Sequence, residues 1–283
     1  MTNSKSVALV IGSGSVKCAA AIGLQNILRR EGIQFNMYVG CSGGSMYAAL
    51  MALGYAPQMI TDLTQHLWTH GITSRHSYRD FFSILLPGLL KFNESFGLVD
   101  DKLVMERMRM AFGDKIFADA QVPLYIATTD FLNGEQVVLT EGKLADAIRA
   151  SIAMPYIFKP HRVDGRLLVD GYLSDPLPIG IAIKEGADII IAMGFDAPYQ
   201  SHINSLPRFS FQISSIMSNN LYKANYAFHN LAHYGEVIPI IPEFSQHVGL
   251  FDTDKIPYII EEGERATEEQ LPYLKRLLET EQT

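Results

Sequence analysis

The chain has 283 residues, of which 48% are hydrophobic, and it carries a formal net charge of −7. This length buries a large core and suits one α/β domain or two small ones, and because no proline- or serine-rich linker divides the chain we expect a single domain over residues 1–283. The acidic balance argues against nucleic acid as a partner, since such proteins carry clustered Lys and Arg.

The two cysteines, Cys18 and Cys41, are too few for a disulfide framework, and both lie in apolar or glycine-rich stretches that suit a free buried thiol. The polar start "MTNSKS" and the short apolar run after it predict no export signal. No run approaches the roughly 20 apolar residues of a membrane span. We therefore expect a soluble cytoplasmic protein that makes at most transient, peripheral contact with membranes.

The first 54 residues predict a β-α-β-α order of elements. "SVALVIGSGS" indicates a strand over Val7–Ile11 that ends in a glycine turn, and the helix that follows has one apolar face and stops at Gly32. A second strand, "FNMYVG", leads into "GCSGGS" and a helix that ends at Gly54. This alternation is typical of a parallel sheet covered by helices.

The rest of the chain continues this mixture of helices and strands. Pro57 suits the first turn of a helix that runs to about Trp68, and residues 76–98 form an irregular stretch. A charged amphipathic helix is expected over about 253–283, at the surface and interrupted near Pro272. Between them the patterns predict helices over 101–112 and 143–153 and strands in "VPLYIATTDF", "EQVVLTEG", "GRLLVDGY", "ADIIIAMGF" and "HYGEVIPII".

The stretch "GCSGG" matches G-x-S-x-G, the nucleophile elbow. Its flanking glycines, Gly40 and Gly44, let a strand turn abruptly into a helix and leave the hydroxyl of Ser42 exposed. The strand before it and the helix after it are the context that this motif requires. A tight packing turn is the alternative interpretation, because the pentapeptide alone is common.

The earlier loop "GSGSVKC" is a second candidate site. It fails as a dinucleotide fingerprint, because Lys17 stands where the third glycine belongs, and it does not complete a phosphate-binding P-loop. What remains is a set of backbone N–H groups at a helix N-terminus, which suits an anion or an oxyanion. The Ser42 strand is its neighbour, so we expect the two loops to face each other.

An ordinary α/β-hydrolase places its nucleophile after several strands and pairs it with a histidine, whereas Ser42 follows the second predicted strand. With the motifs "GSGSVKCAAAIGL", "GCSGGS", "ASIAMPYIFKP" and "VDGYLSDPLP" in this order over residues 7–178, the chain resembles the patatin-like phospholipases. The resemblance implies a three-layer α/β/α fold with a mainly parallel central sheet. It also implies a serine acyl hydrolase that uses a Ser-Asp dyad.

Carried over residue by residue, the resemblance makes Ser42 the nucleophile and Asp170 the acid that orients its hydroxyl and accepts its proton. The family's oxyanion loop falls on Ser13, Gly14 and Ser15, whose backbone N–H groups become the expected donors. The motif-supporting positions are Gly12, Lys17 and Gly171.

This sequence departs from the family's motifs at several positions. The glycine triplet reads Ser-Gly-Ser, which backbone donors tolerate, and Asp175 stands where an asparagine is usual. Cys18 replaces the last glycine of the loop and Tyr172 replaces a small residue. Each of these two adds bulk near the expected site, and we expect them to narrow the acyl pocket.

The implied reaction is ping-pong acyl transfer from a phospholipid, lysophospholipid or other fatty-acyl ester to water, without a metal or cofactor. A free aspartate has a pKa of about 3.9, so burial or a strong hydrogen bond must help Asp170 act as a base near pH 7. An acyltransferase or thioesterase is the alternative enzyme. A catalytically degenerate interaction module is the alternative without chemistry.

Other residues admit both functional and structural interpretations. His66, His70 and His76 suit a polar helix face better than a zinc site, because no third ligand stands at a recognisable spacing. "FFSILLPGLLKF" is a lid or a buried segment, and Lys17 binds phosphate or caps its helix. Competing groups for the base are His229, His233 and His247 in a triad, and the carboxylates of Asp130 and of Asp164, the latter expected in a hairpin turn.

Overall fold

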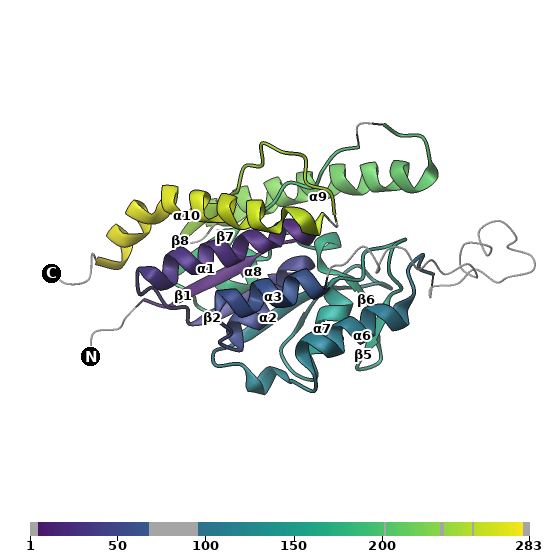
Figure 1. The fold of residues 1–283 in the computed structure, drawn as a ribbon, viewed down its shortest axis with the longest axis horizontal. Coiled ribbons are helices and arrows are strands. Elements are labelled where there is room, and N and C mark those ends of the chain that lie inside the picture. The colour runs from purple at the N-terminus through teal and green to yellow at the C-terminus, as the bar shows by residue number, and fades with distance from the viewer. Residues whose placement is uncertain (1–4, 68–95, 201, 233–234, 251, 280–283) are drawn as a thin grey trace, which may run out of the picture.

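The computed structural model describes residues 5–67, 96–200, 202–232, 235–250 and 252–279. Figure 1 shows a layered molecule in which helices flank a twisted sheet. The stretch "FFSILLPGLLKF", for which a lid and a buried segment were both open interpretations, lies outside the described residues. None of the helices in the described part of the chain combines the length and apolar composition needed to cross a bilayer.

Within the described residues the sheet has eight strands, in the order β5-β6-β3-β2-β1-β7-β8, with β4 paired to β3 beside this path. Strands β3, β2, β1, β7 and β8, which are neighbours in this order, run parallel. Strands β4 and β6 each pair antiparallel with β3, and β5 pairs antiparallel with β6. The strands are β1 (Val7–Ile11), β2 (Met37–Cys41), β3 (Leu124–Asp130), β4 (Gln136–Leu139), β5 (His161–Val163), β6 (Arg166–Asp170), β7 (Ile189–Met193) and β8 (Glu236–Ile240).

Helices cover both faces of this sheet. Leu9 and Ile11 of β1 pack into a cluster with the helices of one face, whereas Ala8 and Val10 pack with the helix that follows β6 on the other. The expected three-layer α/β/α fold is therefore confirmed. The helices are α1 (Ala20–Arg30), α2 (Gly43–Ala52), α3 (Pro57–Leu67), α6 (Asp101–Phe112), α7 (Leu144–Ser151), α8 (Ile179–Lys184), α9 (Leu206–Ala232) and α10 (Ile256–Glu279), with 3₁₀ turns η1 (Ser15–Ala19), η2 (Phe117–Asp119), η3 (Gly171–Leu173) and η4 (Thr253–Lys255).

The C-terminal helix α10 differs from expectation. It runs without interruption through Pro272 and lies along α1, where Ile259 and Leu274 are buried (Figure 1). The two backbones touch, because a Cβ at Gly263 would lie 2.1 Å from the carbonyl oxygen of Ala20. A proline removes one backbone hydrogen bond from a helix, and the packing of this face outweighs that loss.

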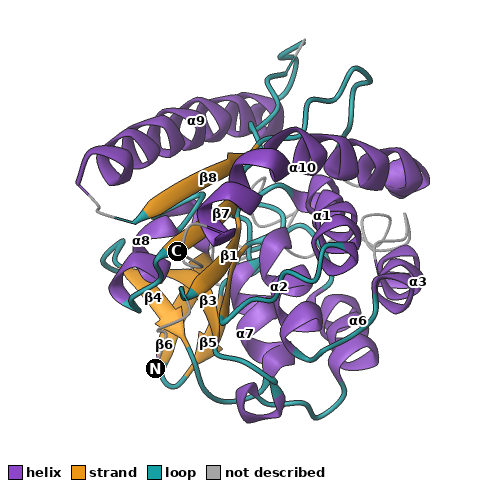
Figure 2. Ribbon diagram, turned by 90° about the vertical axis from the view of Figure 1, so that its left-hand side faces the viewer, coloured by secondary structure: helices purple, strands orange, loops and turns teal. Residues whose placement is uncertain are grey.

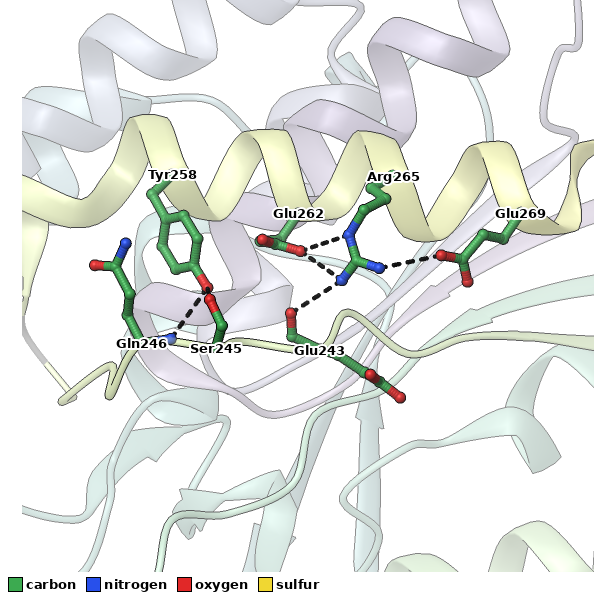
Figure 3. A network of polar contacts seen from close by, with 7 residues as sticks. All are labelled: Glu243, Ser245, Gln246, Tyr258, Glu262, Arg265 and Glu269. Carbon is green, nitrogen blue, oxygen red and sulfur yellow. Dashed lines mark hydrogen bonds and ion pairs between the residues drawn. The ribbon is translucent and has the colours of Figure 1, made fainter.

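Helix α10 also holds residues 241–250, the segment that follows β8 (Figure 3). Arg265 donates to the backbone carbonyl of Glu243 and forms ion pairs with Glu262 and Glu269. The hydroxyl of Tyr258 accepts a hydrogen bond from the N–H of Gln246. These contacts therefore fix the backbone path of this segment at the end of the sheet.

Helices α8 and α9 were not predicted. Figure 2 shows α9 along the β8 side of the molecule, away from α3 and α6. In its C-terminal half, Tyr222 and Tyr226 pack partly buried against the cluster that contains α8. Its N-terminal half carries large apolar side chains that are exposed, among them Phe209 and Met217.

Candidate active site

Ser42 occupies a sharp turn between β2 and α2. Its φ of 53° and ψ of −130° are unusual for a residue with a side chain, and such strain is typical of a nucleophile elbow. The glycines around it allow close backbone contacts. A Cβ at Gly40 would lie 2.4 Å from Cα of Ser45, and one at Gly44 would lie 2.4 Å from the carbonyl oxygen of Ile11.

Asp170 ends strand β6, and the β3–β6 pairing brings it beside the elbow. The Ser42 hydroxyl donates to Asp170 Oδ2 at 2.6 Å, and the Tyr172 N–H donates to Oδ1 at 3.1 Å. Thr129 Oγ1 anchors the backbone by donating to the Asp170 carbonyl at 2.9 Å. The two residues singled out from the sequence are thus in direct contact, although 128 positions separate them.

The environment of Asp170 prepares it to accept a proton at neutral pH. Burial raises the pKa of its carboxyl from 3.8 to about 7, while the hydrogen bonds from Ser42 and the Tyr172 N–H act in the opposite direction. A base with a pKa near the working pH is the most effective in general catalysis. The sequence had indicated that burial or a strong hydrogen bond was needed, and the site has both.

Ser151, at the end of α7, joins the elbow to β3. Its hydroxyl accepts the Ser42 N–H at 2.9 Å and donates to the carbonyl of Ala127 at 2.7 Å. Sequence reasoning did not single it out, although it lies in the motif "ASIAMPYIFKP". A buried serine at a helix end has no periodic or spacing signal, so only its contacts reveal this role.

The glycine loop after β1 lies against the elbow, as expected: a Cβ at Gly43 would lie 2.7 Å from the carbonyl oxygen of Ser15. One expected oxyanion donor needs correction. The N–H of Ser13 donates to the carbonyl of Pro176 at 2.8 Å, so this donor is engaged in holding the loop. Gly14 and Ser15 line the pocket in front of Ser42 and remain candidate donors.

The motif-supporting residues have distinct surroundings. The N–H of Gly12 donates to the carbonyl of Met193 at 2.9 Å, which fixes the loop to β7. Gly171 is buried against β3, and a Cβ there would lie 2.5 Å from the carbonyl oxygen of Ala127. Lys17 lines the pocket and donates to the carbonyl of Asp196 at 3.2 Å, and burial lowers the pKa of its ammonium.

The two bulky departures from the motifs act differently. Cys18 is fully buried, its thiol donates to the carbonyl of Gly12 at 3.4 Å, and it does not line the pocket, so the expectation that it narrows the site is wrong. Tyr172 does line the pocket, as does Ser214 of α9. Asp175 is buried, accepts the Leu177 N–H and contacts α9.

Two adjoining cavities lie at the carboxyl end of the sheet. The one in contact with Ser42 holds only about 60 Å³, and the second, which shares Tyr172 and Phe211 with it, holds about 360 Å³. Helix α9 and the segment held by α10 form their common wall, with Phe211, Ser214, Gly249 and Leu250 lining both. The larger cavity is mainly apolar, with Leu98, Met154, Pro155, Ile157 and Pro198 in its walls.

The competing groups are elsewhere or not described. Among the described histidines, His247 lines the larger cavity but none lines the pocket at Ser42. Asp164 stands in the β5–β6 turn with a φ of 47°, and Asp130 accepts the Leu132 N–H. The described part of the chain has no cluster of three His, Cys, Asp or Glu arranged for a metal ion. His70, His76 and His233 lie outside the described residues, as does the side chain of His66.

Comparisons with known proteins add a family and a fold. The family described as patatin-like phospholipase matches residues 9–183. The chain is 33% identical over 195 residues to the uncharacterized NTE family protein Rv1063c of Mycobacterium tuberculosis, an alignment that covers 69% of this chain and 50% of that protein. It is 30% identical over 195 residues to Neuropathy target esterase sws of Drosophila melanogaster, covering 66% of this chain and 13% of that one.

The chain therefore spans about half the length of the mycobacterial relative and a small part of the insect one. Among solved structures, VipD from Legionella pneumophila superposes with a TM-score of 0.52 at 14% sequence identity, covering 95% of this chain and 67% of that one. At this identity the similarity establishes the fold alone.

Proposed function

Since the chain belongs to the patatin-like phospholipase family, we propose that it hydrolyses carboxylic esters of lipids through an acyl-enzyme on Ser42. One observation carries the proposal: the hydroxyl of Ser42, on a strained turn, donates to the buried Asp170 carboxylate at 2.6 Å. This pairs a nucleophile with a base of matched pKa. No other residue is assigned a proton-transfer role.

In the first half-reaction, Ser42 Oγ attacks the ester carbonyl while Asp170 takes the hydroxyl proton. The tetrahedral anion then collapses, Asp170 gives the proton to the departing alcohol oxygen, and the acyl group remains on Ser42. In the second half, water attacks the acyl carbonyl, Asp170 accepts its proton and returns it to Ser42 Oγ, and the fatty acid leaves.

The developing oxyanion is assigned to the backbone N–H groups of Gly14 and Ser15. Both residues line the pocket beside Ser42, and η1 begins at Ser15, so the N–H groups there belong to a helical N-terminus. One such donor contributes roughly 3 kcal/mol of transition-state stabilisation. Lys17 places a cation in the same pocket wall and adds to the positive potential.

The family and the cavities both support a lipid ester as the substrate. The larger, mainly apolar cavity suits an acyl chain, whose burial contributes about 0.8 kcal/mol per methylene. Phospholipids, lysophospholipids and simpler fatty-acyl esters all present such a chain beside an ester carbonyl. An interaction module without catalysis is the alternative, because the space directly at Ser42 is small.

Labelling with a fluorophosphonate tests the proposal, because this reagent reacts with an activated serine. Wild type should be labelled, Ser42→Ala should not, and Asp170→Asn should fold but be labelled far more slowly. Ser45→Ala is the matched control, since Ser45 lies one turn away and its hydroxyl donates to the Ser42 carbonyl. Absence of labelling in wild type would favour the interaction module, and ester turnover retained in both site variants would refute the dyad.

A further inference from the structure

Helix α9 directs polar side chains inward. Along one face, Asn219 exchanges two hydrogen bonds with the backbone of Ala197, and Ser215 donates to the carbonyl of Pro198 at 2.9 Å. Gln212 accepts the Gln200 N–H at 2.7 Å. These contacts fix the helix over the cavities, where Ser214 lines the same pocket as Tyr172 and Ser42.

The opposite face of α9 is apolar and exposed. It comprises side chains spaced three, four and seven residues apart, which places them on one side of the helix: Phe209, Ile213, Ile216 and Met217. A surface helix of a globular protein normally shows the reverse arrangement, with its apolar stripe buried. The first half of α9, next to the pocket, carries all four of these side chains, and Tyr199 and Ile203 in the preceding loop are also exposed.

The charge of this region differs from that of the rest of the chain. Residues 197–235 contain none of the 30 acidic residues, but they do contain Arg208 and Lys223, in a chain of net charge −7. Both cations are exposed. An apolar stripe with cations and without carboxylates is the pattern of a helix that lies in a lipid interface.

We propose that Phe209, Ile213, Ile216 and Met217 form a docking face for the surface of an anionic phospholipid bilayer. This inference rests on the proposed function, because docking brings the cavities of the active site against the membrane that holds the substrate. A second copy of the chain is the other candidate occupant. A stable protein interface needs about 20–30 residues a side, and this face offers far fewer.

Site-specific fluorescence tests the docking face. The native Cys18 and Cys41 are fully buried, so a thiol-reactive, environment-sensitive dye attaches selectively to an added surface cysteine. Met217→Cys and Met110→Cys are a matched pair, because the two methionines are 66% and 63% exposed on α9 and α6. Both variants carry Ser42→Ala, so that lipid is not consumed and binding is measured independently of catalysis.

With vesicles of phosphatidylglycerol and phosphatidylcholine in equal parts, we expect a blue shift of the dye at position 217 and none at position 110. The double variant Ile213→Ser/Met217→Ser should cosediment with these vesicles at least about tenfold more weakly than the unsubstituted chain. Met110→Ser/Leu132→Ser, which removes two apolar side chains elsewhere that are 63% and 79% exposed, should bind unchanged. Lys223→Gln should weaken binding about fivefold at low salt.

No blue shift at position 217, or equal loss in the two double variants, would overturn the proposal. A blue shift that appears without vesicles and rises with protein concentration would assign the face to a second copy. Failure of the fluorophosphonate test together with intact vesicle binding would remove the hydrolase but keep the docking face.

Discussion

The burial of Asp170 predicts that this carboxyl supports activity but lowers the stability of the folded protein at neutral and higher pH. Its carboxyl is fully buried, and folding raises its pKa from 3.8 to about 7. At 1.36 kcal/mol per unit, this shift corresponds to a penalty of about 4 kcal/mol when the group is ionised in the folded protein. Relaxation of the folded protein around the charge, and the different hydrogen bonds of an asparagine amide, reduce the part of this penalty that the substitution recovers. Asp170→Asn should therefore stabilise the protein by about 2 kcal/mol at pH 8.

The sign of the pH dependence follows from the direction of the shift. The folded state binds the Asp170 proton more tightly than the unfolded state does. The stability that this bound proton contributes is therefore full below about pH 4 and is lost as the pH rises to about 7. The advantage of Asp170→Asn should therefore fall by more than half between pH 8 and pH 5. Asp175, whose pKa burial raises to about 6, contributes equally to both proteins and cancels.

Urea unfolding at the two pH values measures the difference, provided that the slope of free energy against denaturant is unchanged. Ser42→Ala is the matched control, because it also abolishes turnover but keeps the buried carboxyl, so its stability should still fall as the pH rises. A stability difference for Asp170→Asn that is the same at pH 5 and pH 8 would refute the assignment of a raised pKa to this carboxyl.

Three further predictions concern turnover. The value of kcat/KM for a soluble ester should fall about tenfold per pH unit below pH 7, because only the ionised Asp170 accepts the proton of Ser42, and a rate independent of pH between 5 and 8 would contradict this role. Ser151→Ala removes the hydroxyl that bonds the buried N–H of Ser42 and the carbonyl of Ala127, so kcat should drop about tenfold with little change in KM. The control Thr61→Ala on α3, which removes a hydroxyl away from the site, should leave kcat unchanged. Tyr172→Ala removes a wall shared by the two cavities, so the ratio of long-chain to short-chain ester turnover should rise; an unchanged ratio would show that the acyl chain takes another path.

The parts of the fold that the sequence predicted are those with a local signal. The strand Val7–Ile11 and the helix Asp101–Phe112 have the expected bounds, because an apolar run closed by glycine and a run with helical spacing are both legible without tertiary context. The contact between Ser42 and Asp170 was expected from family resemblance, since no local pattern joins residues that far apart.

The misses have a different origin. Helix α9 was not predicted, although its exposed apolar side chains have helical spacing, because the residues that hold its first half to the molecule, among them Ser215 and Asn219, are polar and give no sign of a core-facing helix. Ser13 was expected to be a donor because the family's oxyanion loop falls on it. The carbonyl that engages it belongs to Pro176, which only the folded chain brings there.

The wall of the pocket has a consequence for how the chain is organised. Ser42, Asp170 and the glycine loop all fall within residues 9–183, the stretch that matches the family, whereas α9 and the segment held by α10 lie beyond it. The proposed dyad thus lies in the matched portion of the polypeptide, whereas the shared cavity wall of Phe211, Ser214, Gly249 and Leu250 comes from the portion that follows it. Exchanging residues 196–250 between family members should therefore change this wall while leaving Ser42 and Asp170 in place.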